Sequence, residues 1–172
     1  RAVALLEQGV REAPGHPSLV RNMARHLVAT RRRRQAITMV RKATSLRPHE
    51  GKLHTALGEL LMGAKRNEEA RASFRLALEA GTPDLRAKAR LGDLLRRAGK
   101  LDAAIKLYRE ALALRPGMLE AHNGLGMSLH GLERFDEAIA QYRRGLAHAP
   151  GDPELNNNLG STFYLKGRFP SA

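Results

Sequence analysis

Histidine, serine and acidic side chains are the candidates for chemistry in this sequence, but their spacing favours neither a metal site nor a catalytic site. Two histidines four residues apart would let one helix face hold a metal ion, and no pair has that spacing. No serine stands in a nucleophile-elbow pattern, and no glycine-rich loop follows an expected strand. We therefore expect no catalytic residue, no metal and no cofactor within this sequence. The histidines are His16, His26, His49, His54, His122, His130 and His148.

Charge is the second feature of the sequence that could support a function. Its 172 residues contain 30 Lys and Arg against 17 Asp and Glu, a net charge of +13, which favours acidic partners. The densest cluster, residues 31–34, falls in an expected turn, where arginines are most simply solvated. Cysteine is absent, which excludes a disulfide framework, a thiol nucleophile and cysteine-based metal sites.

Two partner classes are not expected. Proteins that bind single-stranded nucleic acid combine basic grooves with aromatic stacking platforms, and this chain has seven aromatic residues, mostly in expected core positions. We therefore expect no specific nucleic-acid recognition. No apolar run is long enough for a membrane span, and the first residues show no secretory signal. We expect a soluble chain, and the start at Arg1 suggests a piece of a longer protein.

The elements that must position these side chains follow from an internal repeat. One column of alanines recurs every 34 residues, without insertion or deletion. Columns of leucine, glycine and large aromatic or aliphatic residues keep the same step. A period of this length is typical of stacked helix pairs. The alanine column is Ala2, Ala36, Ala70, Ala104, Ala138 and Ala172.

Each period predicts two antiparallel helices joined by a short turn. Leu91, Leu94 and Leu95 form an apolar stripe at helical spacing. Gly99 falls between the two helical patterns, and Pro116 ends the second helix because proline has no N–H to donate. We expect an all-α fold with short connections between antiparallel neighbours.

The glycine column predicts a close approach between helices. Gly92 and Gly126 each lie inside an expected helix, where glycine costs about 1 kcal/mol relative to alanine. We therefore expect a neighbouring helix backbone too close for a side chain, with Ala104 and Ala138 suited to the same contact. The aromatic residues expected in core columns are Phe74, Tyr108, Tyr142 and Phe163.

These columns resemble the tetratricopeptide repeat family. The stretch 119–152 is similar to one full repeat, with Leu125, Gly126, Leu129, Ala138, Tyr142 and Pro150 at signature places. The strict 34-residue period is against the related pentatricopeptide repeats. The bulky first aromatic of the family is replaced here by Val20, His54, Lys88, His122 and Asn156.

The resemblance implies a right-handed superhelical solenoid of antiparallel helix pairs that forms a single array over residues 1–172. In this interpretation both ends fall within a repeat and expose apolar surface. The expected units are residues 1–16 as the second helix of a preceding repeat, 17–50, 51–84, 85–118 and 119–152 as full repeats, and 153–172 as the start of a further repeat.

The same resemblance implies a concave groove lined by the first helix of each repeat, basic at one end and amide-rich at the other. Arg21, Arg86 and Arg90 fit the basic places of family members that clamp a terminal carboxylate, but Arg25 and Ala56 stand where that clamp has asparagines. Other exposed places include Asp93, Arg96, Arg97, Glu120 and Glu154. The predicted groove residues are Arg21, Asn22, Arg25, Lys52, Arg86, Arg90, Asn123, Met127, Asn157, Asn158 and Ser161.

The implied function is a scaffold or adaptor that binds a peptide or protein segment with acidic groups. The runs GLGMSLHGLERFDEAIAQYRRGL and ELNNNLGSTFYLKGRF are similar to bacterial tetratricopeptide lipoproteins of Tad-type pilus assembly, which would imply a periplasmic setting and secretion-machine partners. The bacterial cytoplasm stays open as well. One alternative is the substrate-binding region of a larger enzyme such as a glycosyltransferase, and another is self-assembly through exposed array ends into a homo-oligomer.

Overall fold

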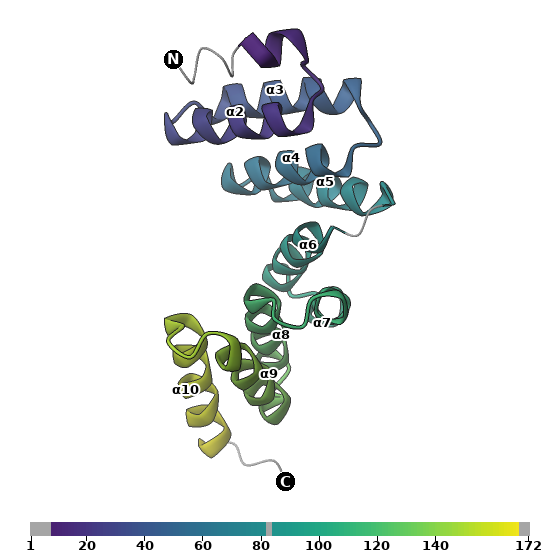
Figure 1. The fold of residues 1–172 in the computed structure, drawn as a ribbon. Helices are drawn as coiled ribbons and strands as arrows, with labels where there is room; N and C mark the ends of the chain where they lie inside the picture. The colour runs from purple at the N-terminus through teal and green to yellow at the C-terminus, as the bar shows by residue number, and fades with distance from the viewer. Residues whose placement is uncertain (1–7, 82–83, 169–172) are drawn as a thin grey trace. The chain divides into compact units, whose positions relative to one another are not determined.

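The computed structural model describes residues 8–81 and 84–168, and these form helices joined by short turns, without a strand (Figure 1). Residues 8–12 are helical, and the rest of the expected first helix, like Ala2 and Ala172, lies outside the described residues. The all-α repeat fold expected from the sequence is confirmed. The helices with determined bounds are α2 (Pro17–Ala29), α3 (Arg33–Leu46), α4 (Gly51–Gly63), α5 (Asn67–Glu79), α6 (Leu85–Arg97), α7 (Leu101–Leu114), α8 (Leu119–Gly131), α9 (Phe135–His148) and α10 (Pro153–Arg168).

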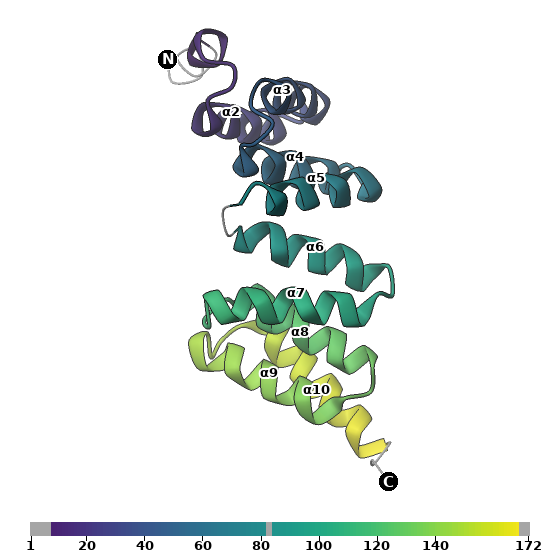
Figure 2. The same cartoon turned by 90° about the vertical axis from the view of Figure 1, so that its right-hand side faces the viewer.

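The chain divides into two compact units, residues 1–87 and 88–172. In the first unit α2 packs on α3, α4 contacts both of them, and α5 packs on α4 (Figure 2). In the second unit α8 packs on α7 and α9, and α10 contacts α9 and α8. The predicted division into individual repeats stays a prediction.

The repeated columns form the core. Alanines 36, 70, 104 and 138 are fully buried, as are Phe74 and Tyr108, and Tyr142 is 1% exposed. Phe163 differs from the expectation because 45% of it is exposed. No helix follows α10 in the described part of the chain to cover that face, and the Phe163 ring instead lies 5.6 Å from the Arg143 guanidinium carbon.

The glycine column has a different cause from the one expected. A Cβ on Gly58 would lie 2.6 Å from the Phe74 ring, and one on Gly126 would lie 2.4 Å from the Tyr142 ring. The close atoms therefore belong to an aromatic side chain of the partner helix and not to its backbone. Gly58, Gly92 and Gly126 thus make room for a flat ring between paired helices, whereas a Cβ on Gly160 of the same column would meet nothing within 4 Å.

The turns within helix pairs close in a repeated way. Arg31, Lys65 and Glu133 have a φ of 60°, and Gly99 has a φ of 74°, so α2, α4, α6 and α8 are each followed by a left-handed residue. The next residue donates its N–H five residues back, as from Lys100 to the Leu95 carbonyl at 2.9 Å. This geometry reverses the chain within a few residues and makes paired helices antiparallel.

A polar group replaces the missing family aromatic. His122 Nε2 lies 2.8 Å from the Pro116 carbonyl oxygen, and His54 Nε2 lies 2.7 Å from that of Pro48. In the same repeat place, the Asn156 amide donates to the Pro150 carbonyl at 3.2 Å. These side chains satisfy a carbonyl in the turn before α4, α8 and α10, whereas Val20 and Lys88 stand at the same position in α2 and α6.

Candidate binding groove on α6, α8 and α10

A cavity of about 620 Å³ lies in the second unit, lined by three first helices of the predicted repeats. This volume is within the range of ligand-binding clefts. Its wall is mostly polar, unlike the helix pair interiors behind it. The lining residues are Arg90, Asp93, Arg96, Arg97, Leu119, Glu120, Asn123, Gly124, Met127, Asp152, Glu154, Leu155, Asn157 and Asn158.

Three arginines of α6 form one side of the cavity. Arg90 Nη1 lies 3.4 Å from Asp93 Oδ2, and both side chains are partly buried. Arg96 Nε is buried and has no hydrogen-bond partner among the described residues. Arg97 is exposed. This side therefore presents guanidinium groups that are only partly satisfied within the protein.

Tyr108 of α7 supports that side from behind. Its hydroxyl donates to Asp93 Oδ1 at 2.7 Å, and its ring is fully buried. Burial raises the pKa of Tyr108, and the nearby Asp93 carboxylate raises it further. The hydroxyl therefore stays protonated and remains a donor throughout the physiological pH range.

Two glycines give Tyr108 its path to the groove wall. A Cβ on Gly92 of α6 would lie 2.9 Å from the Tyr108 ring, and a Cβ on Gly124 of α8 would lie 2.3 Å from it. Real Cβ atoms do not approach so closely, so a larger residue at Gly124 would push the ring aside. The ring thus fixes the spacing of α6 and α8 at the cavity.

Amide side chains form the opposite side. Asn158 of α10 donates to Asn123 Oδ1 of α8 at 2.8 Å, and Asn123 donates to Glu154 Oε2 at 3.2 Å. Asn157 is exposed and has no hydrogen-bond partner within residues 84–168. Met127 is half-buried in the cavity wall. The amides are held in place while leaving donors and acceptors for a ligand.

Carboxylates balance the arginines in this cavity. The lining contains three arginines and four acidic side chains, so it lacks the basic excess of the whole chain. Asp152 is engaged, because its Oδ1 accepts the Leu155 N–H at 2.9 Å and caps α10. Glu120 is exposed. The charge is therefore divided: α6 carries three arginines against Asp93, whereas the charged lining residues of α8 and the start of α10 are all carboxylates.

The structure brings together about half of the groove residues predicted from the sequence. Ser161 lies exposed on α10 and is not among the lining residues. Sequence reasoning missed Asp152, which an Asp-Pro pair before a helix could have indicated, and Gly124, which no column marked. The predicted residues that line the cavity are Arg90, Asn123, Met127, Asn157 and Asn158.

The other predicted groove residues belong to the first unit. Arg25 donates to Asn22 Oδ1 at 2.5 Å within α2, and Arg86 forms an ion pair with Glu59 of α4 at 2.5 Å. Arg21 and Lys52 are exposed. The Arg86 guanidinium is thus already paired with a carboxylate within the protein, which makes it less available to a ligand.

Two expected absences can be compared with the described residues. Residues 8–81 and 84–168 hold no group of three or more His, Asp or Glu side chains placed to bind a metal ion. None of their helices combines the length and apolar character that a membrane span needs.

The fold and the groove define a repeat protein built from helix pairs, in which first helices present a polar surface. The chain belongs to the tetratricopeptide repeat family, whose profile matches residues 21–84, 89–153 and 131–172. No curated protein sequence matches the chain.

Several solved structures share the fold. YrrB, described as a TPR protein with an unusual peptide-binding site, is 22% identical with a TM-score of 0.77, over 96% of this chain and 85% of that one. A thermophilic TPR protein from Thermus thermophilus, TTC0263, is 22% identical with a TM-score of 0.74, over 95% and 89%. Pseudomonas aeruginosa PilF is 18% identical with a TM-score of 0.79, over 88% and 69%. At these identities the likeness concerns the fold.

Proposed function

We propose that this chain is a protein-interaction scaffold that binds an extended peptide segment in the cavity on α6, α8 and α10. The observation that carries the proposal is a cleft of about 620 Å³ whose wall combines fixed amides with incompletely paired arginines. Such walls suit a peptide, because amides can pair with its backbone while charged groups select its side chains.

The divided charge specifies the peptide further. Arg96 and Arg97 favour an acidic side chain on the α6 side of the cavity. Glu120 and Glu154 favour a basic or neutral side chain on the other. A peptide of mixed charge therefore fits this cavity better than a uniformly acidic one. The net charge of the chain had indicated only a ligand with acidic groups.

The cellular setting is the finer part of the proposal. The two sequence runs that resemble Tad-type pilus assembly proteins, together with the fold shared with PilF, support a bacterial secretion or pilus assembly system. YrrB supports peptide recognition as a use of this fold. Tetratricopeptide arrays are typically non-catalytic, which accords with a scaffold.

The experiment is a selection of random 12-residue peptides displayed on phage against the whole chain. Dissociation constants of the selected peptides are then measured by fluorescence anisotropy for the wild type, Arg97→Glu and Asn157→Ala. Both side chains are exposed, so neither substitution should lower the melting temperature. We expect each variant to bind at least about tenfold more weakly, the loss of one charged or bidentate contact.

Lys106→Glu is the matched control. Lys106 is exposed on α7, carries the same charge as Arg97 and does not line the cavity. Equal weakening by Lys106→Glu and Arg97→Glu would show that net charge governs binding, and would contradict a groove site. Selected peptides that bind all variants like the wild type would contradict it as well.

A further inference from the structure

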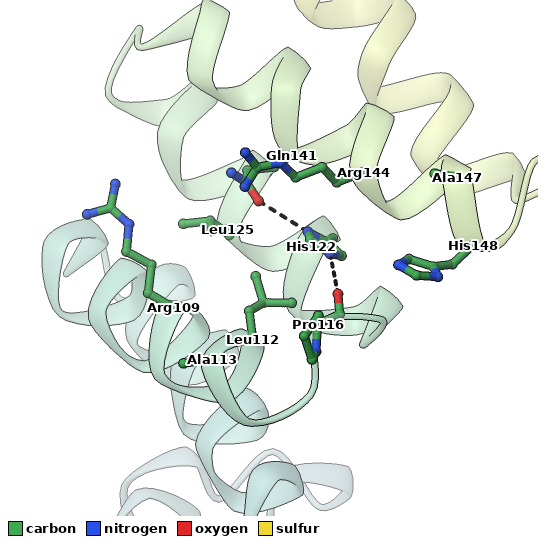
Figure 3. A pocket seen from close by; sticks show the side chains of 10 residues that line it. All are labelled: Arg109, Leu112, Ala113, Pro116, His122, Leu125, Gln141, Arg144, Ala147 and His148. Atoms are coloured by element: carbon green, nitrogen blue, oxygen red, sulfur yellow. Dashed lines mark hydrogen bonds between the residues drawn. The ribbon is translucent and has the colours of Figure 1, made fainter.

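A second hollow of about 500 Å³ lies between α7 and α9, with α8 behind it (Figure 3). None of its lining residues belongs to the groove described above. Leu125 is buried at its floor and Leu112 is half-buried beside it. Arg109 of α7 and Arg144 of α9 border it on different helices. The hollow therefore combines an apolar floor with two cations at its rim.

The rim contains no carboxylate among its lining residues. Arg109 lies 3.5 Å from Glu137, but Glu137 is held more closely by Arg134, at 2.6 Å. Arg144 has no ion pair within residues 84–168. Both rim cations can thus turn to an anionic group without leaving a carboxylate unpaired.

The buried histidine of this hollow, His122, is structural. His122 is 4% exposed, and its two ring nitrogens lie 2.8 Å from the Pro116 carbonyl and 3.1 Å from Gln141 Oε1 (Figure 3). Both nitrogens are therefore engaged and neither is left for a ligand. The ring holds Gln141 against the wall and leaves contact with a ligand to the leucines, the arginines and the exposed His148, which stacks on His122 with ring centroids 6.5 Å apart.

The first unit provides an internal comparison, because the same repeat places occur 68 residues earlier. Pro116, His122 and Leu125 correspond to Pro48, His54 and Leu57, which are the same residue types. In contrast, Leu112 corresponds to Thr44 and Arg144 to Leu76. Ala147 corresponds to Glu79, which would place a carboxylate at the rim. The apolar floor with two arginines and no carboxylate among the lining residues therefore differs from the corresponding position of the first unit.

We propose that this hollow is a second docking site, for an acidic amphipathic segment of a partner protein. One apolar side chain of the partner would enter the hollow over Leu112 and Leu125, and carboxylates on either side of it would pair with Arg109 and Arg144. The positive, carboxylate-free rim selects an acidic partner, and the floor requires an apolar residue between the charges.

The test uses three synthetic peptides of equal length. The first has a central leucine flanked by two glutamates on each side, the second has serine for the leucine, and the third has glutamines for the glutamates. Each is titrated to millimolar concentration into the isotope-labelled whole chain, and amide chemical shifts are followed by NMR. We expect the first peptide to shift amides around Leu112, Leu125 and Ala147, with both analogues at least about tenfold weaker.

Variants separate this site from general charge attraction. Arg109→Glu/Arg144→Glu should abolish the shifts, and Ala147→Glu, which copies Glu79, should weaken binding without disturbing the exposed site. Arg41→Glu/Arg75→Glu makes the same charge change in the first unit and should leave binding intact. Equal binding by the serine analogue, shifts confined to α10, or no saturable binding would each overturn the proposal.

Discussion

The Tyr108 hydroxyl on α7 donates a hydrogen bond to the Asp93 carboxylate on α6 at 2.7 Å, through a gap that two glycines leave open. Asp93 in turn faces Arg90 in the groove wall. A core aromatic residue of a second helix therefore orients charged groups of a first helix. Fold stability and groove geometry are coupled at this contact.

Tyr108→Phe tests that coupling. The variant keeps the ring in the core but removes a hydrogen bond to a carboxylate, so we expect a loss of about 1.5–3 kcal/mol in the free energy of unfolding. Urea unfolding measures the loss. Selected groove peptides should also bind more weakly, because Asp93 no longer has a fixed position beside Arg90. A free energy of unfolding and a peptide affinity equal to those of the wild type would show that this hydrogen bond does not position Asp93.

Gly124→Ala and Gly160→Ala form a matched pair on first helices. A Cβ on Gly124 would lie 2.3 Å from the Tyr108 ring, whereas a Cβ on Gly160 meets nothing within 4 Å. We expect Gly124→Ala to destabilise by about 1–3 kcal/mol through overpacking. Gly160→Ala should stabilise by about 0.5–1 kcal/mol, since alanine favours the helix. Thermal unfolding that shows the same sign for both variants would refute the explanation that Gly124 makes room for the Tyr108 ring.

The period of 34 residues was sufficient to predict the helices, because each column places an apolar side chain on the same helix face in every repeat. Tyr108 and Phe74 were predicted in the core for that reason, and they are buried. Phe163 occupies an apolar position of the repeat but is exposed, because burial requires a covering helix as well as an apolar position in the sequence. A periodic sequence thus predicts which face is apolar, while its neighbours decide whether that face is covered.

The groove was harder to predict than the fold. The family resemblance implied groove positions at Arg90 and Asn123, and both residues line the cavity. It also implied Arg86, which instead pairs with Glu59. The predicted groove was basic at one end and amide-rich at the other, and the cavity also contains four carboxylates that are not among the predicted groove residues. Pairing between side chains of different helices depends on three-dimensional distances that one-dimensional spacing does not contain.

Alkaline pH should unfold the protein in a way that depends on Tyr142. Burial raises the pKa of Tyr142 from 10.0 to about 12, opposed by its hydrogen bond with Thr162. The neutral form is thus favoured in the fold, and its stabilisation is complete below pH 10 and is lost as the pH rises toward 12. We expect a loss of about 2 kcal/mol over that interval.

Tyr142→Phe checks the origin of this pH dependence. Phenylalanine cannot ionise, so the variant should show a flatter decline of urea stability between pH 10 and 12 than the wild type. Tyr108 still titrates in the variant, which leaves part of the decline. An unchanged slope would mean that the buried Tyr142 hydroxyl does not govern alkaline unfolding.

His122→Ala tests the polar replacement of the family aromatic. It removes both hydrogen bonds of a 4% exposed ring, so we expect a loss of about 1–3 kcal/mol in the free energy of unfolding. Asn156→Ala, at the same repeat place but exposed, should cost less than about 1 kcal/mol. Calorimetry on both variants gives the comparison, and equal costs would contradict a special role for the buried carbonyl contact.

The most direct measurement of the groove proposal is an NMR map of the isotope-labelled chain with its best selected peptide. The account predicts amide shifts concentrated at Arg97, Asn123 and Asn157, with side-chain amide shifts at Asn158. It also predicts that Arg97→Glu removes these shifts while Lys106→Glu preserves them. Shifts that fall mainly outside α6, α8 and α10, or that survive Arg97→Glu, would contradict the account.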